Sequence, residues 1–445
     1  MPTPGSQQLI SRISAAVRPR PASRGTWWLP LVGVVGWLWW TLWPTLRAPF
    51  GMADDHAIID MTAPSGRLPW AHLPATVGNL TSEPVGRFRP LYWTGQALEA
   101  ALWGRHPTMW YVDRLLLATI TLVCLYVVLS KVLHPVLAAM ISALPFCGPQ
   151  VETWTRLGPN EAYAMPLTAA GVMLVLVPAL RGRTRPHEAW AGYLLLALAG
   201  LAKESFVTVG PGLCLVMVVL GWSRLTRRDW AVAGGVWAAA LVDLTAIELK
   251  VHRYGSLYPQ VHTVGSVAGF LGHVALYETV GAALPILVGL IVVLQKSSGS
   301  RDMKPAALVL VGVLMLALPQ IYLNAGAARD IEGRYLYPLV LTMVLLWGYA
   351  GWLVRRSPQA RRLTVLLAVV LALPLTVGAA YGRSVAQKNA ATTSQFQATI
   401  SHVEHAADEL HARTIVIQPS DPYWDYEPVE SYAAYLKADG YTVVT

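Results

Sequence analysis

Charged side chains are scarce in this sequence, and their scarcity excludes an ordinary soluble globule. Only 13% of the 445 residues are Asp, Glu, Lys or Arg, whereas a typical soluble domain carries about 25%. The mean hydropathy is +0.44, and the apolar residues gather in runs of about 20, the length that crosses a bilayer as a helix. The composition therefore predicts an α-helical polytopic membrane protein.

Cysteine and the common catalytic motifs are also rare or missing. The three cysteines, Cys124, Cys147 and Cys214, lie in apolar runs without paired spacing, which excludes a disulfide framework and a cysteine zinc site. There is no Gly-x-x-x-x-Gly-Lys phosphate loop, no His-Glu-x-x-His and no nucleophile elbow. Tryptophan is abundant instead, with 18 residues against 6 phenylalanines, as expected where amphipathic rings lie at membrane interfaces.

The apolar runs predict about 11 transmembrane helices, although ten or twelve remain open. The first run follows a polar, Arg-bearing segment and is expected to be retained as a helix. The expected spans are 27–46, 110–130, 132–147, 161–180, 189–202, 206–222, 230–249, 276–295, 305–323, 335–354 and 362–381. Lys203–Glu204–Ser205 separates the fifth span from the sixth.

Basic residues predict the orientation. With a cytoplasmic N-terminus, every short inner connection carries Lys or Arg, as in 181–185 and 355–362. Such a bias marks the cytoplasmic side, so much of the net charge of +9 reflects topology, and no nucleic acid partner is expected. We expect a multi-pass protein of the plasma (inner) membrane, with a cytoplasmic segment 1–26, a transmembrane domain 27–381 and an extracytoplasmic tail 382–445.

Two extracytoplasmic regions are long enough to carry function. The first outer loop, 47–109, is rich in Asp, His, Arg, Pro and Trp and should hold short interfacial helices, because long loops in compact proteins are usually functional. The tail alternates an expected helix over 393–412, a strand at Thr414–Gln418, a helix at Val429–Lys437 and a strand at Tyr441–Thr445. This alternation predicts a small α/β cap.

Asp54 and Asp55 open the first outer loop, beside His56. Adjacent carboxylates next to an imidazole could act as a general base or ligate a divalent cation. Their apolar neighbours predict that the pair sits on a short packed helix, with one carboxylate facing an acceptor and the other orienting a neighbour. We favour Asp55 slightly as the base; a solvated interfacial turn is the competing interpretation.

Arg87 and Arg89 follow in an aromatic, Pro-ordered turn of the same loop. Arginine pairs bidentately with phosphate oxygens, so the two residues could hold a lipid phosphate, or simply attract headgroups. Lys203 and Glu204 interrupt a long apolar stretch. Charges at membrane depth usually face a cavity or each other, so this pair is expected either at a binding cavity or in a mutual ion pair.

The later outer loops supply further candidates. Arg334 enters an apolar run, which suits a cation that binds phosphate at a cavity rim or one that snorkels to the interface. The remaining candidates for substrate binding are polar or aromatic residues of these loops: Glu152, Glu161, Glu332, Tyr335, Tyr258 and His262.

Together these features resemble the GT-C superfamily of integral membrane glycosyltransferases. The resemblance rests on a first span followed by a long outer loop with an acidic pair, Arg-rich turns, the Lys-Glu break, the late Glu-x-Arg-Tyr and an outer C-terminal domain. It implies sugar transfer from a polyprenyl-phosphate donor to a glycan, lipid or protein acceptor of the cell envelope. It also implies Asp54 or Asp55 as the base and Arg87, Arg89, Lys203 and Arg334 as donor phosphate contacts.

The expected chemistry is an inverting displacement at the anomeric carbon. The sequence identifies no certain cofactor, but a divalent metal on Asp54 and Asp55 would be compatible with this reaction. A lipid phosphate is already a good leaving group, so the base and the surrounding cations could suffice. Two other functions stay open: a lipid-linked sugar flippase or transporter, which would need polar residues at mid-bilayer depth, and a non-catalytic membrane assembly protein.

Overall fold

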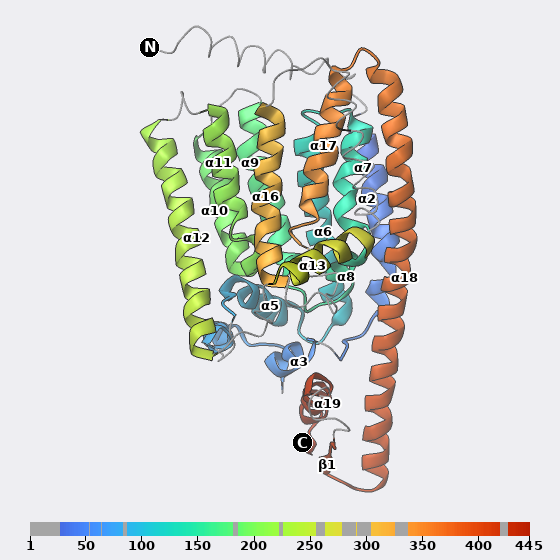
Figure 1. The fold of residues 1–445 in the computed structure, drawn as a ribbon. Coiled ribbons are helices and arrows are strands. Elements are labelled where there is room, and N and C mark those ends of the chain that lie inside the picture. Colours follow the sequence, from blue (N-terminus) through green and yellow to red (C-terminus); the bar gives the residue numbers. More distant parts are fainter. Residues whose placement is uncertain are drawn as a thin grey trace.

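Helices side by side form almost the whole molecule in the computed structural model (Figure 1). The structure describes residues 27–52, 54–63, 65–82, 87–180, 186–221, 226–254, 263–277, 291, 304–324, 337–418 and 426–445.

Five helices in this part of the chain are long and apolar enough to cross a membrane. They are α2 (Leu29–Leu42, extended by the 3-10 turn Trp43–Arg47), α6 (Pro107–Leu129), α9 (Glu161–Leu180), α12 (Arg227–Tyr254) and α18 (Ala360–Glu409). Beside them lie α7 (Pro135–Ala143), α10 (Pro186–Ala202), α11 (Val209–Gly221), α16 (Lys304–Asn324) and α17 (Leu341–Arg356). The fold is that of a helical membrane protein.

The number of spans remains a prediction. The expected eighth span, 276–295, lies mostly outside the described residues. The expected span 132–147 is a short α7 followed by the 3-10 turn Leu144–Phe146, and the expected span 335–354 becomes helical only at Leu341.

The side chains of the bundle separate into a packed interior and an apolar outer surface. Leu38, Leu122 and Trp347 are almost fully buried in one core that joins α2, α6 and α17. Val242 and Leu373 lie on the outside with 70% and 68% of their surface exposed. An outer face of this kind is costly in water but suits lipid contact, which agrees with the hydropathy of the sequence.

The predicted outer segments gather at one end of the bundle. The lower end in Figure 1 carries α3 (His56–Thr62), α5 (Pro90–Trp103), α8 (Glu152–Thr155) and α13 (Val264–Tyr277). α4 (Leu73–Ser82) packs on α5. The Arg-rich connection between α17 and α18 lies at the opposite end (Figure 1). This separation fits the predicted topology, while the side of the membrane that each end faces stays a prediction.

The tail contains the expected strands and second helix, but its first helix differs from the expectation. β1 (Thr414–Val416) pairs in parallel with β2 (Thr442–Val444), with α19 (Tyr426–Ala438) between them along the chain. No break separates the last span from the tail, because α18 runs unbroken for 50 residues and extends well beyond the bundle (Figure 1). Residues 383–396 are polar but contain neither Gly nor Pro, the two residues that most disfavour a helix interior.

Candidate functional site

The Asp54–Asp55 turn, defined here as residues 50–55, lies at the loop-bearing end of the bundle. The expectation that the pair sits on a helix is wrong, because α3 begins only at His56 and Asp55 occupies its N-cap position. Asp54 has a φ of 64°, a left-handed conformation that few residues other than glycine adopt and that Asp tolerates better than most. Such backbone strain is often found at functional sites.

The two carboxylates have different surroundings. Asp55 is 3% exposed, and its Oδ2 accepts a hydrogen bond of 2.6 Å from the backbone N–H of Gly51. Burial raises the pKa of Asp55 from 3.8 to about 7; the Gly51 hydrogen bond opposes this rise and the charge of Asp54 adds to it. Asp54 is partly exposed and lies directly on Gly158, where an added Cβ would come within 2.1 Å of its Oδ2.

The loop beneath Asp54, residues 155–160, is fixed by side chains from three helices. Each donates to a backbone carbonyl: Tyr92 Oη to Gly158 at 2.9 Å, Arg114 Nη2 to Leu157 at 3.0 Å and Asn389 Nδ2 to Thr155 at 2.6 Å. Burial raises the pKa of Tyr92 well above its ordinary value, so the phenol keeps the proton that it donates. These hydrogen bonds therefore fix the backbone of the loop against which Asp54 packs.

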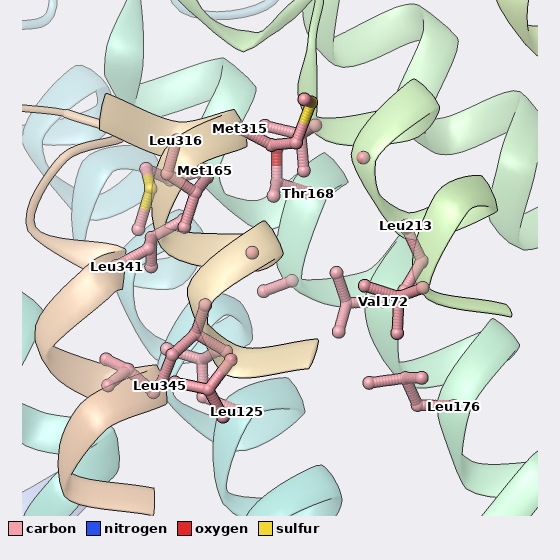
Figure 2. Close-up of a pocket in the computed structure, with 17 residues that line it drawn as sticks. Leu125, Met165, Thr168, Val172, Leu176, Leu213, Met315, Leu316, Leu341 and Leu345 are labelled. Atoms are coloured by element: carbon pink, nitrogen blue, oxygen red, sulfur yellow. The ribbon is translucent and has the colours of Figure 1, made fainter. Parts of the chain in front are cut away.

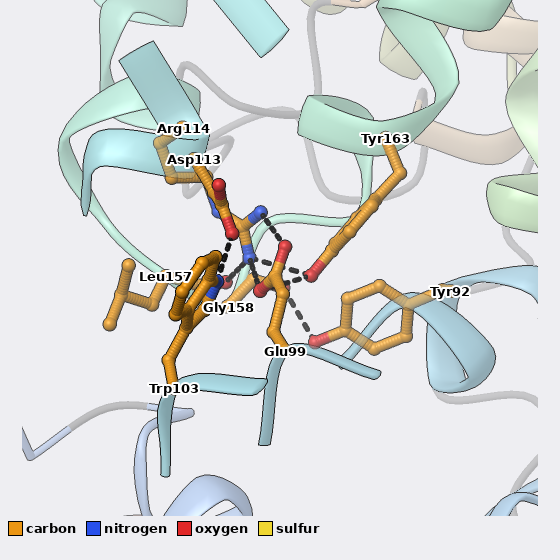
Figure 3. Close-up of polar contacts among 8 residues, drawn as sticks. All are labelled: Tyr92, Glu99, Trp103, Asp113, Arg114, Leu157, Gly158 and Tyr163. Atoms are coloured by element: carbon orange, nitrogen blue, oxygen red, sulfur yellow. Dashed lines mark hydrogen bonds and ion pairs between the residues drawn. The ribbon is translucent and has the colours of Figure 1, made fainter. Parts of the chain in front are cut away.

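A buried ion pair between Arg114 and Glu99 holds this loop through the hydrogen bond from Arg114 to Leu157 (Figure 3). Arg114 donates to both carboxylate oxygens of Glu99, at 3.1 and 3.3 Å, and to the hydroxyl of Tyr163 at 2.8 Å. Arg114 and Glu99 are 1% and 7% exposed. Next to them the indole N–H of Trp103 donates to Asp113. Sequence reasoning missed this group, and its one visible signal was an arginine within an apolar span.

A second buried group, the Arg89–Glu204 cluster, contacts the same loop through Asn160 and consists of Arg89, Asn160, Glu161, Lys203 and Glu204. Arg89 pairs bidentately with Glu204, with 2.6 Å between Nε and Oε2, and donates to Asn160 Oδ1 at 2.9 Å. Lys203 Nζ lies 3.2 Å from Glu161 and 3.6 Å from Glu204. Arg89 and Lys203 are each 4% exposed. The predicted Lys203–Glu204 break is thus brought into a network of ion pairs.

The other predicted residues are placed less centrally. His56 Nδ1 lies 3.2 Å from Ser431 Oγ, and His56 Nε2 lies 3.8 Å from Glu430. Arg87 and Glu152 are partly exposed at the same end of the bundle. Five predicted residues lie outside the described part of the chain: Tyr258, His262, Glu332, Arg334 and Tyr335. Among the described residues, no three His, Cys, Asp or Glu side chains gather as a metal site would require.

An apolar cavity of about 250 Å³ lies between α6, α9, α11, α16 and α17 (Figure 2). Its described lining is apolar except for Thr168. Val209 and Leu341 also line it, and these are the first residues of α11 and α17. The cavity therefore reaches the first turns of both helices, and its apolar lining suits a hydrocarbon chain.

Comparison with known proteins identifies no relative. No protein-family model matches the chain, and neither the curated proteins nor the solved structures contain a significant match.

Proposed function

We propose that the protein is a membrane glycosyltransferase that moves a sugar from a polyprenyl-phosphate donor to an acceptor hydroxyl with inversion at the anomeric carbon. The observation that carries the proposal is the Asp54–Asp55 turn. It presents one partly exposed carboxylate on a strained backbone and holds a second, buried one behind it. A preorganised carboxylate at the end of an apolar bundle suits proton removal from an acceptor beside a lipid-borne substrate.

We assign the role of general base to Asp54. Asp55 is buried and already accepts a hydrogen bond from Gly51, so its role is to fix the turn. Asp54 is the more exposed carboxylate, and it rests on Gly158. In the reaction, Asp54 takes the proton of the acceptor hydroxyl. At the same time the oxygen of that hydroxyl forms the new bond to the anomeric carbon. The bond from that carbon to the phosphate oxygen breaks, and polyprenyl phosphate leaves with the electron pair.

The donor phosphate would then be stabilised by arginines of the predicted outer loops. Arg89 and Lys203 have carboxylate partners at 2.6 to 3.6 Å and are buried, so we assign them to holding the loop that carries Asn160. Arg87 and, from the sequence, Arg334 are the phosphate contacts that we propose, because a guanidinium binds phosphate through two parallel hydrogen bonds. The isoprenoid chain would enter the apolar cavity beside Val209 and Leu341.

The proposal is tested by donor consumption in purified, lipid-reconstituted protein. A panel of polyprenyl-phosphate sugars is supplied with a membrane extract as the source of acceptor, and release of polyprenyl phosphate is measured. Asp54→Asn should lose at least about a hundredfold in rate, the lower range for general-base help. Asp60→Asn is the matched control, because Asp60 is exposed on α3 only a few residues away. Equal rates in Asp54→Asn and wild-type protein would remove the base role.

A lipid-linked sugar flippase is the second candidate, and Asp243 favours it. This residue of α12 is 5% exposed and lines an apolar cavity of about 190 Å³ between α10, α11 and α12. Ionisable residues within a membrane often mark transport pathways. If reconstituted protein moves a lipid-linked sugar across vesicles, with Asp243→Asn blocking and Asp54→Asn sparing the movement, the flippase replaces the transferase.

A further inference from the structure

The Asp54–Asp55 turn is held by the C-terminal tail at three consecutive peptide units. Gln397 Nε2 donates to the carbonyl of Phe50 at 2.8 Å, and Tyr435 Oη donates to the carbonyl of Gly51 at 3.1 Å. Ser431 Oγ donates to the carbonyl of Met52. Three side chains more than 340 positions along the chain therefore fix the backbone immediately before the two aspartates.

The donors come from two elements that approach the turn together. Ser431 and Tyr435 are one helical turn apart, so they lie on the same face of α19. Gln397 comes from the part of α18 near Phe396, whose ring contacts that of Tyr435 edge-on with centroids 5.2 Å apart. Tyr435 is 6% exposed and Ser431 is fully buried. Burial also raises the pKa of Tyr435 far above its ordinary value, so its hydroxyl stays a donor.

Gly51 is the point at which the tail and the aspartates meet. Its carbonyl accepts from Tyr435, and its N–H donates to Asp55. An added Cβ at this position would lie 2.8 Å from Thr393 Cγ2 of α18, so the Thr393 side chain packs directly on Gly51 and would have to shift to admit a larger residue. A displacement of the tail would therefore be transmitted to Asp55 through a single residue, Gly51.

We infer that the tail acts as a clamp on the Asp54–Asp55 turn and that Gln397, Ser431 and Tyr435 are positioning residues for the reaction. The consequence for catalysis rests on the proposed function; the clamp itself rests on the contacts. Without these donors three carbonyls near the buried Asp55 lose their partners, and water would have to enter to satisfy them. Asp54 would then no longer hold one direction over Gly158.

Hydrogen exchange of the full-length protein in lipid tests the clamp without an activity assay. In the variant Gln397→Leu/Ser431→Ala/Tyr435→Phe, the amides of 50–56 should exchange roughly tenfold to a hundredfold faster, as expected when two or three modest hydrogen bonds are lost. Peptides from α6 and α17 should not change. Tyr432→Phe is the matched control, since Tyr432 lies on α19 and packs its ring on Phe396. Unchanged exchange over 50–56 in the triple variant would overturn the clamp.

Kinetics then separate positioning from folding. Tyr435→Phe alone is the conservative variant, because it removes one hydroxyl and keeps the ring contact with Phe396. It should lower kcat about five- to tenfold, the effect of one hydrogen bond, while KM for the donor stays at the wild-type value and the unfolding temperature falls by no more than about 4 °C. Faster exchange with an unchanged kcat would refute the positioning role. If wild-type protein consumes no lipid-linked sugar, the proposed function fails, and hydrogen exchange alone decides the clamp.

Discussion

The Asp54–Asp55 turn and the Arg89–Glu204 cluster are both dense in charge, yet they differ in the burial of their charges and in the strain of their backbone. In the cluster each cation has a carboxylate within 3.6 Å, and both cations are 4% exposed. In the turn two carboxylates are adjacent, one of them partly exposed and on a strained backbone. Breaking a buried ion pair is strongly destabilising, whereas a strained backbone conformation is often found at functional sites. The burial and the ion pairing of a charged residue must therefore be known before that residue can be assigned a structural or a functional role.

The largest effect on stability should come from breaking the Arg89–Glu204 cluster. Glu204→Gln removes the carboxylate that pairs with both Arg89 and Lys203, and removing one member of a buried ion pair costs roughly 3–5 kcal/mol. Unfolding of the purified protein should reveal this loss. Glu409→Gln is the control, because Glu409 pairs with His405 on the surface, where both side chains are about 70% exposed and such pairs contribute little. Equal stability of the two variants would contradict a structural role for the Arg89–Glu204 cluster.

Asp55 should make stability depend on pH in a direction opposite to that of a paired carboxylate. Its pKa is raised in the folded protein, so the folded state binds the proton more tightly than the unfolded chain, and stability falls as pH rises from about 4 to about 7. Asp55→Asn removes the charge and can still accept from Gly51. Because the pKa rises from 3.8 to about 7, the variant should gain up to about 4 kcal/mol at pH 8.

The pH dependence is measured by unfolding wild-type protein and Asp55→Asn in parallel between pH 5 and pH 8. The gap between the two should widen with pH. A constant gap across this range would mean that Asp55 is not a buried, protonatable group.

The smallest expected effect concerns donor binding by Arg87. Loss of a charged contact to phosphate costs about 1.5–3 kcal/mol, so Arg87→Ala should weaken polyprenyl-phosphate binding about tenfold or more. Arg87→Lys should recover only part of the affinity, since the planar fork is lost. Native mass spectrometry or calorimetry in detergent gives the affinity. Binding unchanged in Arg87→Ala would leave Arg334 as the proposed contact.

Much of the fold follows from properties that are local in the sequence. Hydropathy over about 20 residues marks a buried or lipid-facing helix, and the alternation of basic connections predicts which loops share an end. The strands at 414–416 and 442–444 and helix α19 also lie where short-range patterns predict them. The expected break between the last span and the tail helix is absent for a physical reason: at Gly382 the chain changes from apolar to polar, but no Gly or Pro follows in α18 to end the helix.

The site was less predictable because its contacts are distant in the sequence. Asp54 and Asp55 stand next to each other in the chain, and their composition alone suggests chemistry. The pairing of Arg89 with Glu204 spans 115 positions, and that of Tyr435 with Gly51 spans 384. Nothing local to Arg89 distinguishes a phosphate ligand from a partner of a remote carboxylate. Likewise, the left-handed backbone of Asp54 depends on the packing of 155–160 and the tail.

The most direct test of the account compares Asp54→Asn and Asp55→Asn in one single-turnover assay, with donor affinity measured on the same preparations. The account predicts that Asp54→Asn loses at least about a hundredfold in transfer rate at unchanged donor affinity, since it removes the base. It predicts that Asp55→Asn keeps at least about a tenth of the wild-type rate, because its amide oxygen still accepts from Gly51 and at most part of one hydrogen bond is lost. A large loss in Asp55→Asn with near wild-type rates in Asp54→Asn would contradict the assignment.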